Sequence, residues 1–447
     1  MPIKIIIIAG TRPELIKLAP LLKIITEDPE FSLLFIHAGQ HYDYSMSKIF
    51  LEELSLPLPN FNIECGSGSH GYQTGTLLIE IERILVENKP DIVLAEGDTN
   101  TVLASALATK KINKCFMHLE AGIRSFDKRM PEEINRNITA FCATFHLVPT
   151  ERAAKNLLFE GIDPKSIFIV GNTIVDAVLQ NKKLAQTKSK IFENLKINVD
   201  KPIVLITLHR PANVDNKNSL ELFINSLNEL HNFQFIFPIH PRTKKNLQDF
   251  NLLSKLQKSS NILVTEPLGY LDFFRIFSES LCVLTDSGGI QEESSILKVP
   301  CITLRNNTER PETLEYGTNV LVGLDMEKMK SEILKIRSDS TYLRGKETQN
   351  PFGDGKASER IVKIIKDLYN QNKLSNEYSK LWEGIPSRVL KKVENKDVLK
   401  SVNDYENENN IEIKLIFDEK GQPHFPFNSK ALEKGDIILI NYFKKDL

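Results

Sequence analysis

Short apolar runs alternate with longer amphipathic stretches through most of this chain of 447 residues. Gly or Asp bounds most of the short runs, which favours buried strands, and the stretches between them have the periodicity of helices. The first series of predicted strands comprises 5–9, 33–37, 92–94 and 115–119. Strands and helices in such alternation predict an α/β fold, in which helices cover both faces of a parallel sheet.

The same pattern starts again in the second half of the chain. The second series of predicted strands comprises 203–208, 235–239, 262–264, 283–285 and 301–303. An apolar run ends at Gly171, before a helix rich in alanine, valine and leucine, so we place the join between two domains there. We predict a first Rossmann-like domain over 1–172 and a second over 173–355.

The end of the chain has a different character. A helix is predicted within 356–372, from about Ala357 to Leu368, where it packs back on the body. A polar, asparagine-rich spacer follows at 403–410, and two further strands are predicted at 411–417 and 437–443. We therefore predict that 383–447 form a small appended module, whose role the pattern does not indicate.

Composition and charge exclude several classes of protein. A chain of 447 residues exceeds what one hydrophobic core usually covers, which supports two domains. The net charge of -1 leaves no basic field for nucleic acid and no polybasic patch for a membrane. The apolar run 5–9 is too short for a secretory or membrane-spanning segment. We expect a cytoplasmic protein that binds neither nucleic acid nor membrane.

Cysteine and histidine spacing does not indicate a metal site. The five cysteines are scattered without a C-x-x-C pair, so neither disulfides nor a cysteine-rich zinc site is predicted. His37 and His41 are four residues apart, but Gly39 breaks the helix that such a ligand pair requires. We therefore expect no metal.

Three carboxylates follow predicted strands or open a helix in the first domain. Asp98 and Glu120 stand where strands stop, and Glu132 stands in the first turn of a helix. Ligands of α/β folds bind in the crevice outside the carboxyl ends of the strands. With His209 at the end of a strand of the second domain, the pattern indicates proton transfer. The alternatives are solvated loop acids and a histidine whose partners are backbone groups.

Two helix starts have the features of phosphate sites, because free N–H groups and the helix dipole favour anions there. Thr11 and Glu14 stand at capping-box spacing, and Arg12 and Lys17 add positive charge. The alternative for this segment is a capped helix with solvated cations.

The second helix start follows Asp286-Ser287-Gly288-Gly289, where two glycines let a ligand approach the backbone closely. Glu293 lies one to two turns further, about where a carboxylate binds ribose hydroxyls, and Arg310 is a candidate charge partner. We interpret this region as a nucleotide-diphosphate site. His240, at the end of a neighbouring strand, is a weaker candidate of the same kind as His209.

Six ordered motifs carry a family resemblance. They are G-T-R-P-E from Gly10, E-G-D-T from Glu96, H-L-E-A-G-I-R-S from His118, P-E-E-I-N-R from Pro131, D-S-G-G-I-Q-E-E from Asp286 and E-R-P-E from Glu309. Over residues 1–370 the chain resembles the non-hydrolysing UDP-N-acetylglucosamine 2-epimerases, and within them the archaeal branch. The module after residue 383 lies outside the resemblance.

The resemblance implies a GT-B architecture, with two Rossmann-like domains and a cleft between them, that binds a UDP-sugar without a cofactor. It implies anti elimination of UDP to a 2-acetamidoglucal, followed by re-addition that inverts C2. Asp98, Glu120, Glu132 and His209 match the family's catalytic residues. The matched substrate-binding residues are Arg12, Lys17, Phe273, Ser287, Gly288, Gly289, Glu293 and Arg310. We also expect a homodimer.

Three other functions compete with this interpretation. A UDP-2,3-diacetamido-glucuronate 2-epimerase shares several motifs but needs an added cation for the C6 carboxylate. A GT-B glycosyltransferase shares the fold and the nucleotide site, but generally uses one catalytic base. A non-catalytic sensor of UDP-sugar has no need for Asp98, Glu120 and Glu132 together.

Overall fold

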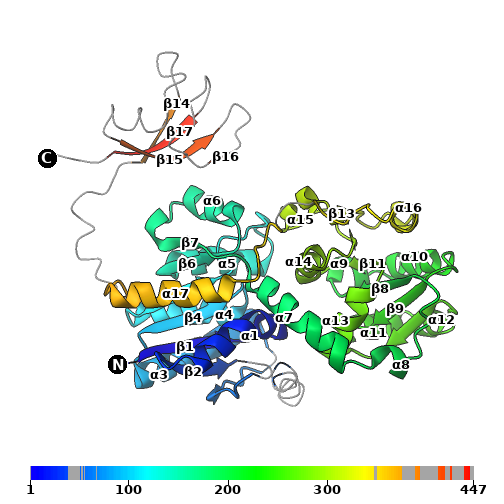
Figure 1. Ribbon diagram of the computed structural model, residues 1–447, viewed down its shortest axis with the longest axis horizontal. Coiled ribbons are helices and arrows are strands. Elements are labelled where there is room, and N and C mark those ends of the chain that lie inside the picture. Colours follow the sequence, from blue (N-terminus) through cyan, green and yellow to red (C-terminus); the bar gives the residue numbers. More distant parts are fainter. Residues whose placement is uncertain are drawn as a thin grey trace. The chain divides into compact units, whose positions relative to one another are not determined.

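The computed structural model of this chain contains two compact units (Figure 1). It describes residues 2–38, 51, 54, 56–66, 68–346 and 350–374, and four strand segments beyond them. Unit 1 comprises Met1–Pro2, Ile8–Ser69 and Val170–Ile365. Unit 2 comprises Ile3–Ile7, His70–Ile169 and Lys366–Leu447. The domain boundaries proposed from the sequence stay predictions.

The first sheet has seven strands in the order β3-β2-β1-β4-β5-β6-β7. Its strands are β1 (Ile3–Ala9), β2 (Phe31–His37), β3 (Phe61–Asn62), β4 (Ile92–Glu96), β5 (Cys115–Leu119), β6 (Phe145–Val148) and β7 (Ile167–Ile169). The connecting helices are α1 (Arg12–Glu27), α3 (His70–Asn88), α4 (Asn100–Lys111), α5 (Pro131–Cys142), α6 (Glu151–Phe159) and the 3₁₀ helix η2 (Pro164–Ser166). The four strands predicted from apolar runs are confirmed, and β3, β6 and β7 were missed.

The second sheet lies in unit 1 and has six strands in the order β10-β9-β8-β11-β12-β13, all parallel. Its strands are β8 (Ile203–Thr207), β9 (Gln234–Pro238), β10 (Ile262–Thr265), β11 (Cys282–Thr285), β12 (Cys301–Thr303) and β13 (Asn319–Leu321). The helices around it are α8 (Ile191–Asn194), α9 (Pro211–Val214), α10 (Lys217–Asn228), α11 (Pro241–Asp249), α12 (Leu253–Gln257), α13 (Tyr270–Glu279), α14 (Gly288–Leu297), α15 (Pro311–Tyr316) and α16 (Met326–Ser338). The predicted α/β fold is confirmed.

Helices cover both faces of the second sheet (Figure 1). Val204 and Ile206 belong to a core that contains Phe223 of α10 and Met329 of α16. Leu205, which lies between them in β8, belongs to another core on the opposite face, with residues of α8 and α13. Successive side chains of a strand point to opposite faces, so a strand covered on both sides needs a continuous apolar run.

Strand register brings the ends of β4 and β5 together in unit 2. Ala95 pairs with His118, and Glu96 pairs with Leu119. All five residues of each strand are buried. The loops that follow these strands, which carry Asp98 and Glu120, therefore start at the same edge of the sheet.

Two long helices flank the second series of elements, α7 (Thr173–Lys188) and α17 (Ala357–Asn370). The helix predicted from Ala357 is thereby confirmed. The buried carboxylate of Asp176 accepts the backbone N–H groups of Ala357, at 3.2 Å, and Ser358, at 2.9 Å. Asp176 therefore caps α17 from α7 and fixes the start of the last helix of the body.

The C-terminal module contains a four-stranded antiparallel sheet in the order β14-β17-β15-β16. Its strands are β14 (Arg388–Lys392), β15 (Ile411–Phe417), β16 (Pro423–His424) and β17 (Ile437–Tyr442). The two strands predicted there are confirmed, while β14 and β16 were missed. Among the residues that the structure describes, no helix combines the length and apolar character needed to cross a membrane.

Candidate functional site

The three predicted acid/base carboxylates all lie in unit 2. Asp98 follows β4, Glu120 follows β5, and Glu132 lies in the first turn of α5. The side chain of Asp98 is 28% exposed, Glu120 is half-buried and Glu132 is exposed. All three carboxylates can therefore be reached from solvent, as a group that exchanges protons with a substrate must be.

Arg136 of α5 holds Asp98 in place. Its Nε donates to Asp98 Oδ2 at 2.9 Å, and its Nη1 donates to Glu133 Oε2 at 2.9 Å. Asn135, beside it on the helix, donates to the backbone O of Asp98 at 2.9 Å. The guanidinium is buried, so it fixes the carboxylate of Asp98 through charge-assisted hydrogen bonds. The sequence analysis gave Arg136 no role, although it ends the P-E-E-I-N-R motif.

Glu132 and Glu133 occupy different environments, although they are neighbours in α5. Glu133 is buried and accepts the N–H groups of Ser125, at 2.9 Å, and Phe126, at 3.0 Å. Burial alone would raise the pKa of Glu133, but these hydrogen bonds and Arg136 hold that pKa below its usual value. Glu133 thus anchors the loop before α5, whereas the exposed Glu132 is available to a ligand.

Glu120 has a backbone conformation that is uncommon for a residue other than glycine, with a φ of 63°. Gly122, two residues later, has a φ of 82°, and a Cβ there would lie 2.2 Å from the backbone O of Ala153 in α6. Asn156 of α6 donates to the Gly122 O at 2.9 Å. The close packing of α6 against Gly122 therefore sets the turn from which Glu120 projects, and strained backbone of this kind is concentrated at functional sites.

A neutral histidine connects the loops that carry Asp98 and Glu120. Nε2 of His118 donates to the backbone O of Gly97 at 2.8 Å. Burial lowers the pKa of His118 to about 3, so its imidazole is uncharged at neutral pH. His118 thereby ties the end of β5 to the turn before Asp98 without adding a charge beside the carboxylates.

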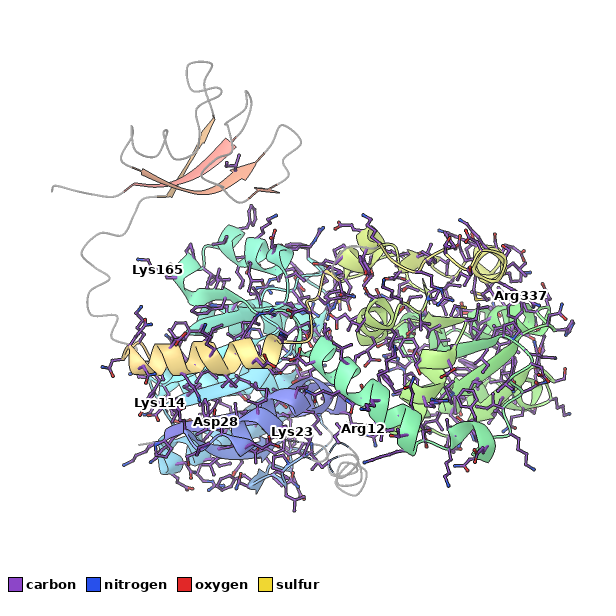
Figure 2. The ribbon with its side chains drawn as sticks, viewed as in Figure 1. Arg12, Lys23, Asp28, Lys114, Lys165 and Arg337 are labelled. Carbon is purple, nitrogen blue, oxygen red and sulfur yellow. The ribbon has the colours of Figure 1, made fainter. Side chains whose placement is uncertain are left out.

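The start of α1 in unit 1 is capped by the carboxylate of Glu14. Glu14 accepts the backbone N–H groups of Gly10 and Thr11, which confirms the capping box. Arg12 lies at this end of the helix, and Asp28 lies just past the other end (Figure 2). The Nε of Arg12 is buried and has no hydrogen-bond partner among the described residues. Because an unpaired buried donor is costly, this N–H is available to an anionic ligand.

The start of α14 exposes backbone to a ligand. Ser287 is the N-cap residue, and its hydroxyl does not cap the helix. A Cβ at Gly288 would lie 2.8 Å from Oε1 of Glu309, whereas a Cβ at Gly289 would meet nothing within 4 Å. A side chain at Gly288 would thus displace the carboxylate of Glu309, and Gly289 leaves open space at the helix start. Free N–H groups beside such space can bind a phosphate.

Two adjacent glutamates of α14 are buried and differ in their partners. Glu292 is 0% exposed, and its Oε1 accepts hydrogen bonds from Nε of Arg310 and from Asn172, the latter at 3.3 Å. Burial and the neighbouring Glu292 raise the pKa of Glu293 to about 8, and Lys17 of α1 acts in the opposite direction. The structure therefore brings the predicted residues Lys17, Glu293 and Arg310 into one electrostatic network.

His209 lies at the end of β8 and is fixed by a buried carboxylate. Its Nδ1 lies 3.1 Å from Oδ1 of Asp286, which is 0% exposed. Oδ2 of Asp286 also accepts the N–H of Arg210 at 2.9 Å and the side-chain amide of Asn213 at 3.0 Å. Nδ1–H of His209 thus donates to Asp286, which leaves Nε2 for a ligand. Burial lowers the pKa of His209 below its usual value, and the negative charge of Asp286 opposes this shift only in part.

Phe273 lies on α13, where its ring packs edge-to-face on Phe277 with 6.0 Å between centroids. It is half-buried against the core of the second sheet. The ring can thus present its free face to a flat ligand such as a base. Sequence reasoning missed the supporting roles of Asp286, Glu292 and Arg136, although all three stand inside motifs that it quoted.

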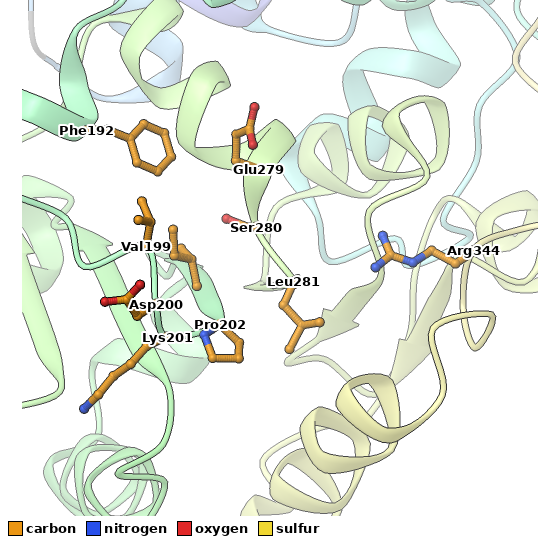
Figure 3. A pocket seen from close by; sticks show the side chains of 10 residues that line it. Phe192, Val199, Asp200, Lys201, Pro202, Glu279, Ser280, Leu281 and Arg344 are labelled. Carbon is orange, nitrogen blue, oxygen red and sulfur yellow. The ribbon is translucent and has the colours of Figure 1, made fainter.

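A separate pocket of about 470 Å³ lies in unit 1, at the opposite end of the second sheet (Figure 3). Its lining includes Lys201, Pro202 and Ile203, at the beginning of β8, and Leu281, just before β11. None of the predicted site residues lines it. We therefore assign the candidate site to the carboxyl ends of the strands and not to this pocket.

The two groups of residues have complementary chemistry. The carboxylates of unit 2 can accept and donate protons. The helix starts and cations of unit 1 can bind a diphosphate and stabilise the negative charge that develops on it as a leaving group. A reaction that moves a proton while a bond to a diphosphate breaks requires both kinds of chemistry.

Known proteins are similar to this chain over most of its length. A family model described as UDP-N-acetylglucosamine 2-epimerase matches residues 23–366. A Methanocaldococcus jannaschii protein named UDP-N-acetylglucosamine 2-epimerase is 50% identical over 368 residues, covering 81% of this chain and 98% of that protein. A Pseudomonas aeruginosa protein named UDP-2,3-diacetamido-2,3-dideoxy-D-glucuronate 2-epimerase is 37% identical over 371 residues, covering 82% and 100%.

Solved structures of the same family have a similar fold. The crystal structure of the Methanocaldococcus jannaschii UDP-GlcNAc 2-epimerase in complex with UDP-GlcNAc and UDP matches with a TM-score of 0.74 and 49% identity. The match covers 82% of this chain and 100% of that one. The C-terminal module lies beyond the residues that the family model matches.

Proposed function

Because this chain belongs to the UDP-N-acetylglucosamine 2-epimerase family, we propose that it interconverts UDP-N-acetylglucosamine and UDP-N-acetylmannosamine. The chain is an isomerase with a GT-B-like fold. The observation that carries the proposal is that three acid/base carboxylates lie in unit 2, where the buried Arg136 holds one of them, Asp98, in place. A protein that only bound a UDP-sugar would not need acid/base groups in reach of solvent.

The reaction breaks two bonds of the sugar before it restores them. A carboxylate removes the C2 proton, the C–H electron pair forms the C1–C2 double bond, and UDP leaves with the C1–O electron pair. The resulting glucal then receives a proton on the other face of C2, and UDP adds again at C1. Because the two faces are opposed, at least two acid/base groups are needed. Asp98, Glu120 and Glu132 are the groups that we assign to these transfers.

The groups of unit 1 make this chemistry feasible at a weakly acidic carbon. Removal of the C2 proton must be coupled to the departure of UDP, whose diphosphate gains negative charge in the transition state. We assign the stabilisation of that charge to Arg12, His209 and the helix starts of α1 and α14. Glu293 is assigned to the ribose, Phe273 to the uracil, and Lys17 and Arg310 to further contacts with the substrate.

We expect deuterium at C2 of the product when the reaction runs in deuterated water. Elimination transfers the C2 proton to a carboxylate that exchanges with solvent, so the returning proton comes from the solvent. Proton NMR of UDP-N-acetylglucosamine with enzyme measures the substrate, the reaction and the exchange together. Asp215→Asn, at an exposed carboxylate of the second sheet, is a matched control that should exchange normally. A product that keeps all its C2 hydrogen contradicts the mechanism.

The same measurement with UDP-2,3-diacetamido-2,3-dideoxy-D-glucuronate tests the main rival. That activity is the printed name of a relative at 37% identity, compared with 50% for the archaeal UDP-N-acetylglucosamine 2-epimerase. We expect kcat/KM to favour UDP-N-acetylglucosamine. If kcat/KM favours the glucuronate instead, the proposed substrate is wrong, whereas the proposed type of reaction still holds.

We further propose a homodimer that forms through the outer faces of α3 and α5. Tyr72, Ile79 and Val86 recur every seven residues on α3 and are 53–67% exposed. On α5, the exposed apolar residues Ile134, Ile138 and Phe141 also share one face. α3 and α5 both pack against α4, and apolar stripes on two such helices resemble an interface rather than scattered surface residues.

A second copy of this chain is the occupant that suits the face. A standard interface buries about 800 Å² on each partner, and six large apolar side chains with their polar surroundings can supply that area. The exposed edge of α3 carries Glu82 and Glu87, and α4 ends at the exposed Lys111. A two-fold axis can pair these opposite charges twice.

The Ile79→Glu variant is expected to be monomeric, because a charge in the middle of an apolar interface is left without a partner. Sedimentation velocity should give twice the mass of one chain for the unchanged protein. For the variant it should give the mass of one chain. Leu222→Glu, at a residue of α10 that is 59% exposed, is a matched control and should remain dimeric. If the Ile79→Glu variant is still a dimer, the interface lies on another face of the protein.

A further inference from the structure

Two histidine rings lie side by side at the carboxyl end of the second sheet. His209 follows β8 and His240 follows β9, and these strands are neighbours in the sheet. Their ring centroids are 5.5 Å apart, with 39° between the ring planes. At this distance the charge of one ring acts on the other.

The proton positions of the two rings differ because their Nδ1 atoms have opposite partners. Nδ1–H of His209 donates to the buried Asp286 at 3.1 Å. Nδ1 of His240 accepts the backbone N–H of Arg242 at 3.2 Å and thereby caps α11. His240 therefore carries its proton on Nε2 while it is neutral. A second proton on its Nδ1 would break the helix cap.

The cap also supports the end of β8. In the first turn of α11, the hydroxyl of Thr243 donates to the backbone O of Leu208 at 2.5 Å. Leu208 directly precedes His209. Loss of the cap at His240 would thus loosen the segment that holds His209 in place.

The charged groups around the pair favour a single positive charge on His209. Asp286 contacts His209, and its two oxygens accept no hydrogen bond from His240 among the bonds of the described residues. Arg210 faces His209 and pairs with Glu309, and Arg242 faces His240 and pairs with Asp215. Partial burial lowers the pKa of His240, and positive charge on His209 lowers that pKa further, while Asp286 acts in the opposite direction.

We propose that His240 is a positioning residue that forms a coupled pair with His209, and that near neutral pH at most one of the two rings takes up the extra proton that makes it positively charged. His209 takes that proton, because Asp286 stabilises the charged ring. His240 stays neutral and keeps the cap of α11 intact. The pair therefore presents one positive charge, at His209, on a helix-capped segment that does not move when the charge appears.

For the reaction, this arrangement rests on the assignment of His209 to the diphosphate. Negative charge on the departing UDP favours protonation of His209, which has Nε2 free for it. Without His240, the segment before α11 would lack its cap at the moment when the charge changes. With His240 charged as well, two like charges would lie 5.5 Å apart and the cap would be lost.

The test is a titration of imidazole signals by NMR in the full chain labelled with ¹⁵N-histidine. The chain has nine histidines, so the two signals are assigned by their loss in His209→Asn and His240→Asn. In the free enzyme we expect His209 to titrate first and His240 at a lower pH. In His209→Asn, the pKa of His240 should rise by up to about half a pH unit, since one charge at this distance is removed.

The variants separate a proton role from a structural one. His240→Asn retains a side-chain oxygen that can cap α11, so it should fold and bind UDP normally. His231→Asn, on the exposed turn before β9, is a matched control that should leave both titrations unchanged. If the pKa of His240 is the same in the unchanged protein and in His209→Asn, the proposal is wrong.

A second measurement identifies the role of UDP. Calorimetry in two buffers of different ionisation enthalpy gives the number of protons taken up when UDP binds at pH 7. We expect the same uptake in the unchanged enzyme and in His240→Asn, and loss of that uptake in His209→Asn. Coupled titrations without proton uptake would support the histidine pair and contradict the assignment of His209 to the diphosphate. Uptake that disappears in His240→Asn, in contrast, would overturn the proposal.

Discussion

Asp98→Asn is expected to lower turnover by at least about a hundredfold, which is the usual size of a general acid/base contribution. The Asn side chain has nearly the same shape and can still accept a hydrogen bond from Arg136, but it cannot take a proton. The affinity for UDP should change little, because the diphosphate is assigned to other groups. Steady-state kinetics and calorimetry with UDP measure the two quantities separately.

Glu120→Gln and Glu132→Gln should lose turnover by a similar factor. Asp127→Asn is a matched control on the loop before α5, where the half-buried Asp127 pairs with the exposed Arg129. We expect that variant to remain active. Near-normal turnover in Asp98→Asn would remove this residue from the chemistry and leave Glu120 and Glu132 as the only candidates.

Glu133→Gln serves to distinguish Glu132 from its neighbour. Glu133 is buried and holds the backbone of Ser125 and Phe126, so its replacement should lower thermal stability as well as turnover. Glu132 is exposed, so its replacement should lower turnover alone. A normal Glu132→Gln enzyme together with a folded but inactive Glu133→Gln enzyme would show that Glu133 is the catalytic member.

Arg310→Met is expected to lower the free energy of unfolding of unit 1 by about 3–5 kcal/mol, the usual cost of breaking a buried ion pair. Arg310 pairs with Glu292, which is 0% exposed, so the variant leaves a carboxylate buried without its cation. Urea denaturation measures the loss. UDP affinity should fall in the same variant, because Arg310 is assigned to the substrate.

The double variant Glu292→Met with Arg310→Met is the control for this prediction. When both partners become apolar and keep a similar volume, no unpaired charge remains, so most of the stability should return. UDP affinity should stay low, because the cation is still absent. Arg242→Ala breaks an ion pair that is exposed on both sides and should change stability far less. Equal losses in Arg310→Met and Arg242→Ala would contradict the role of burial.

The fold could be predicted where the local pattern and the tertiary environment agree. Strands such as β8 are buried on both faces, so their buried residues, 203–206 in β8, form a continuous apolar run that is visible in the sequence. β7 and β13 were missed because each has three residues, most of them only half-buried. β14 and β16 of the C-terminal sheet were missed as well, since β14 pairs with the distant β17 and β16 has only two residues.

The loops of the candidate site were indicated by residue types that act locally. Glycine, proline and carboxylates at strand ends marked the loops that follow β4, β5 and β11, because tight turns and helix starts require those residue types. The family resemblance then named the individual residues. It could not separate Glu132 from Glu133, because the two are adjacent and chemically alike.

By itself, the sequence determined the alternation of strands and helices, the two series of elements and the positions of the motifs at strand ends. These follow from burial and turn chemistry, which act on neighbouring residues. The tertiary structure alone decided that Arg136 holds Asp98, that Asp286 fixes His209 and that Lys17 lies near Glu293. Such pairs join residues far apart in the chain, and their distances and burial depend on how whole elements pack, which a local pattern does not contain.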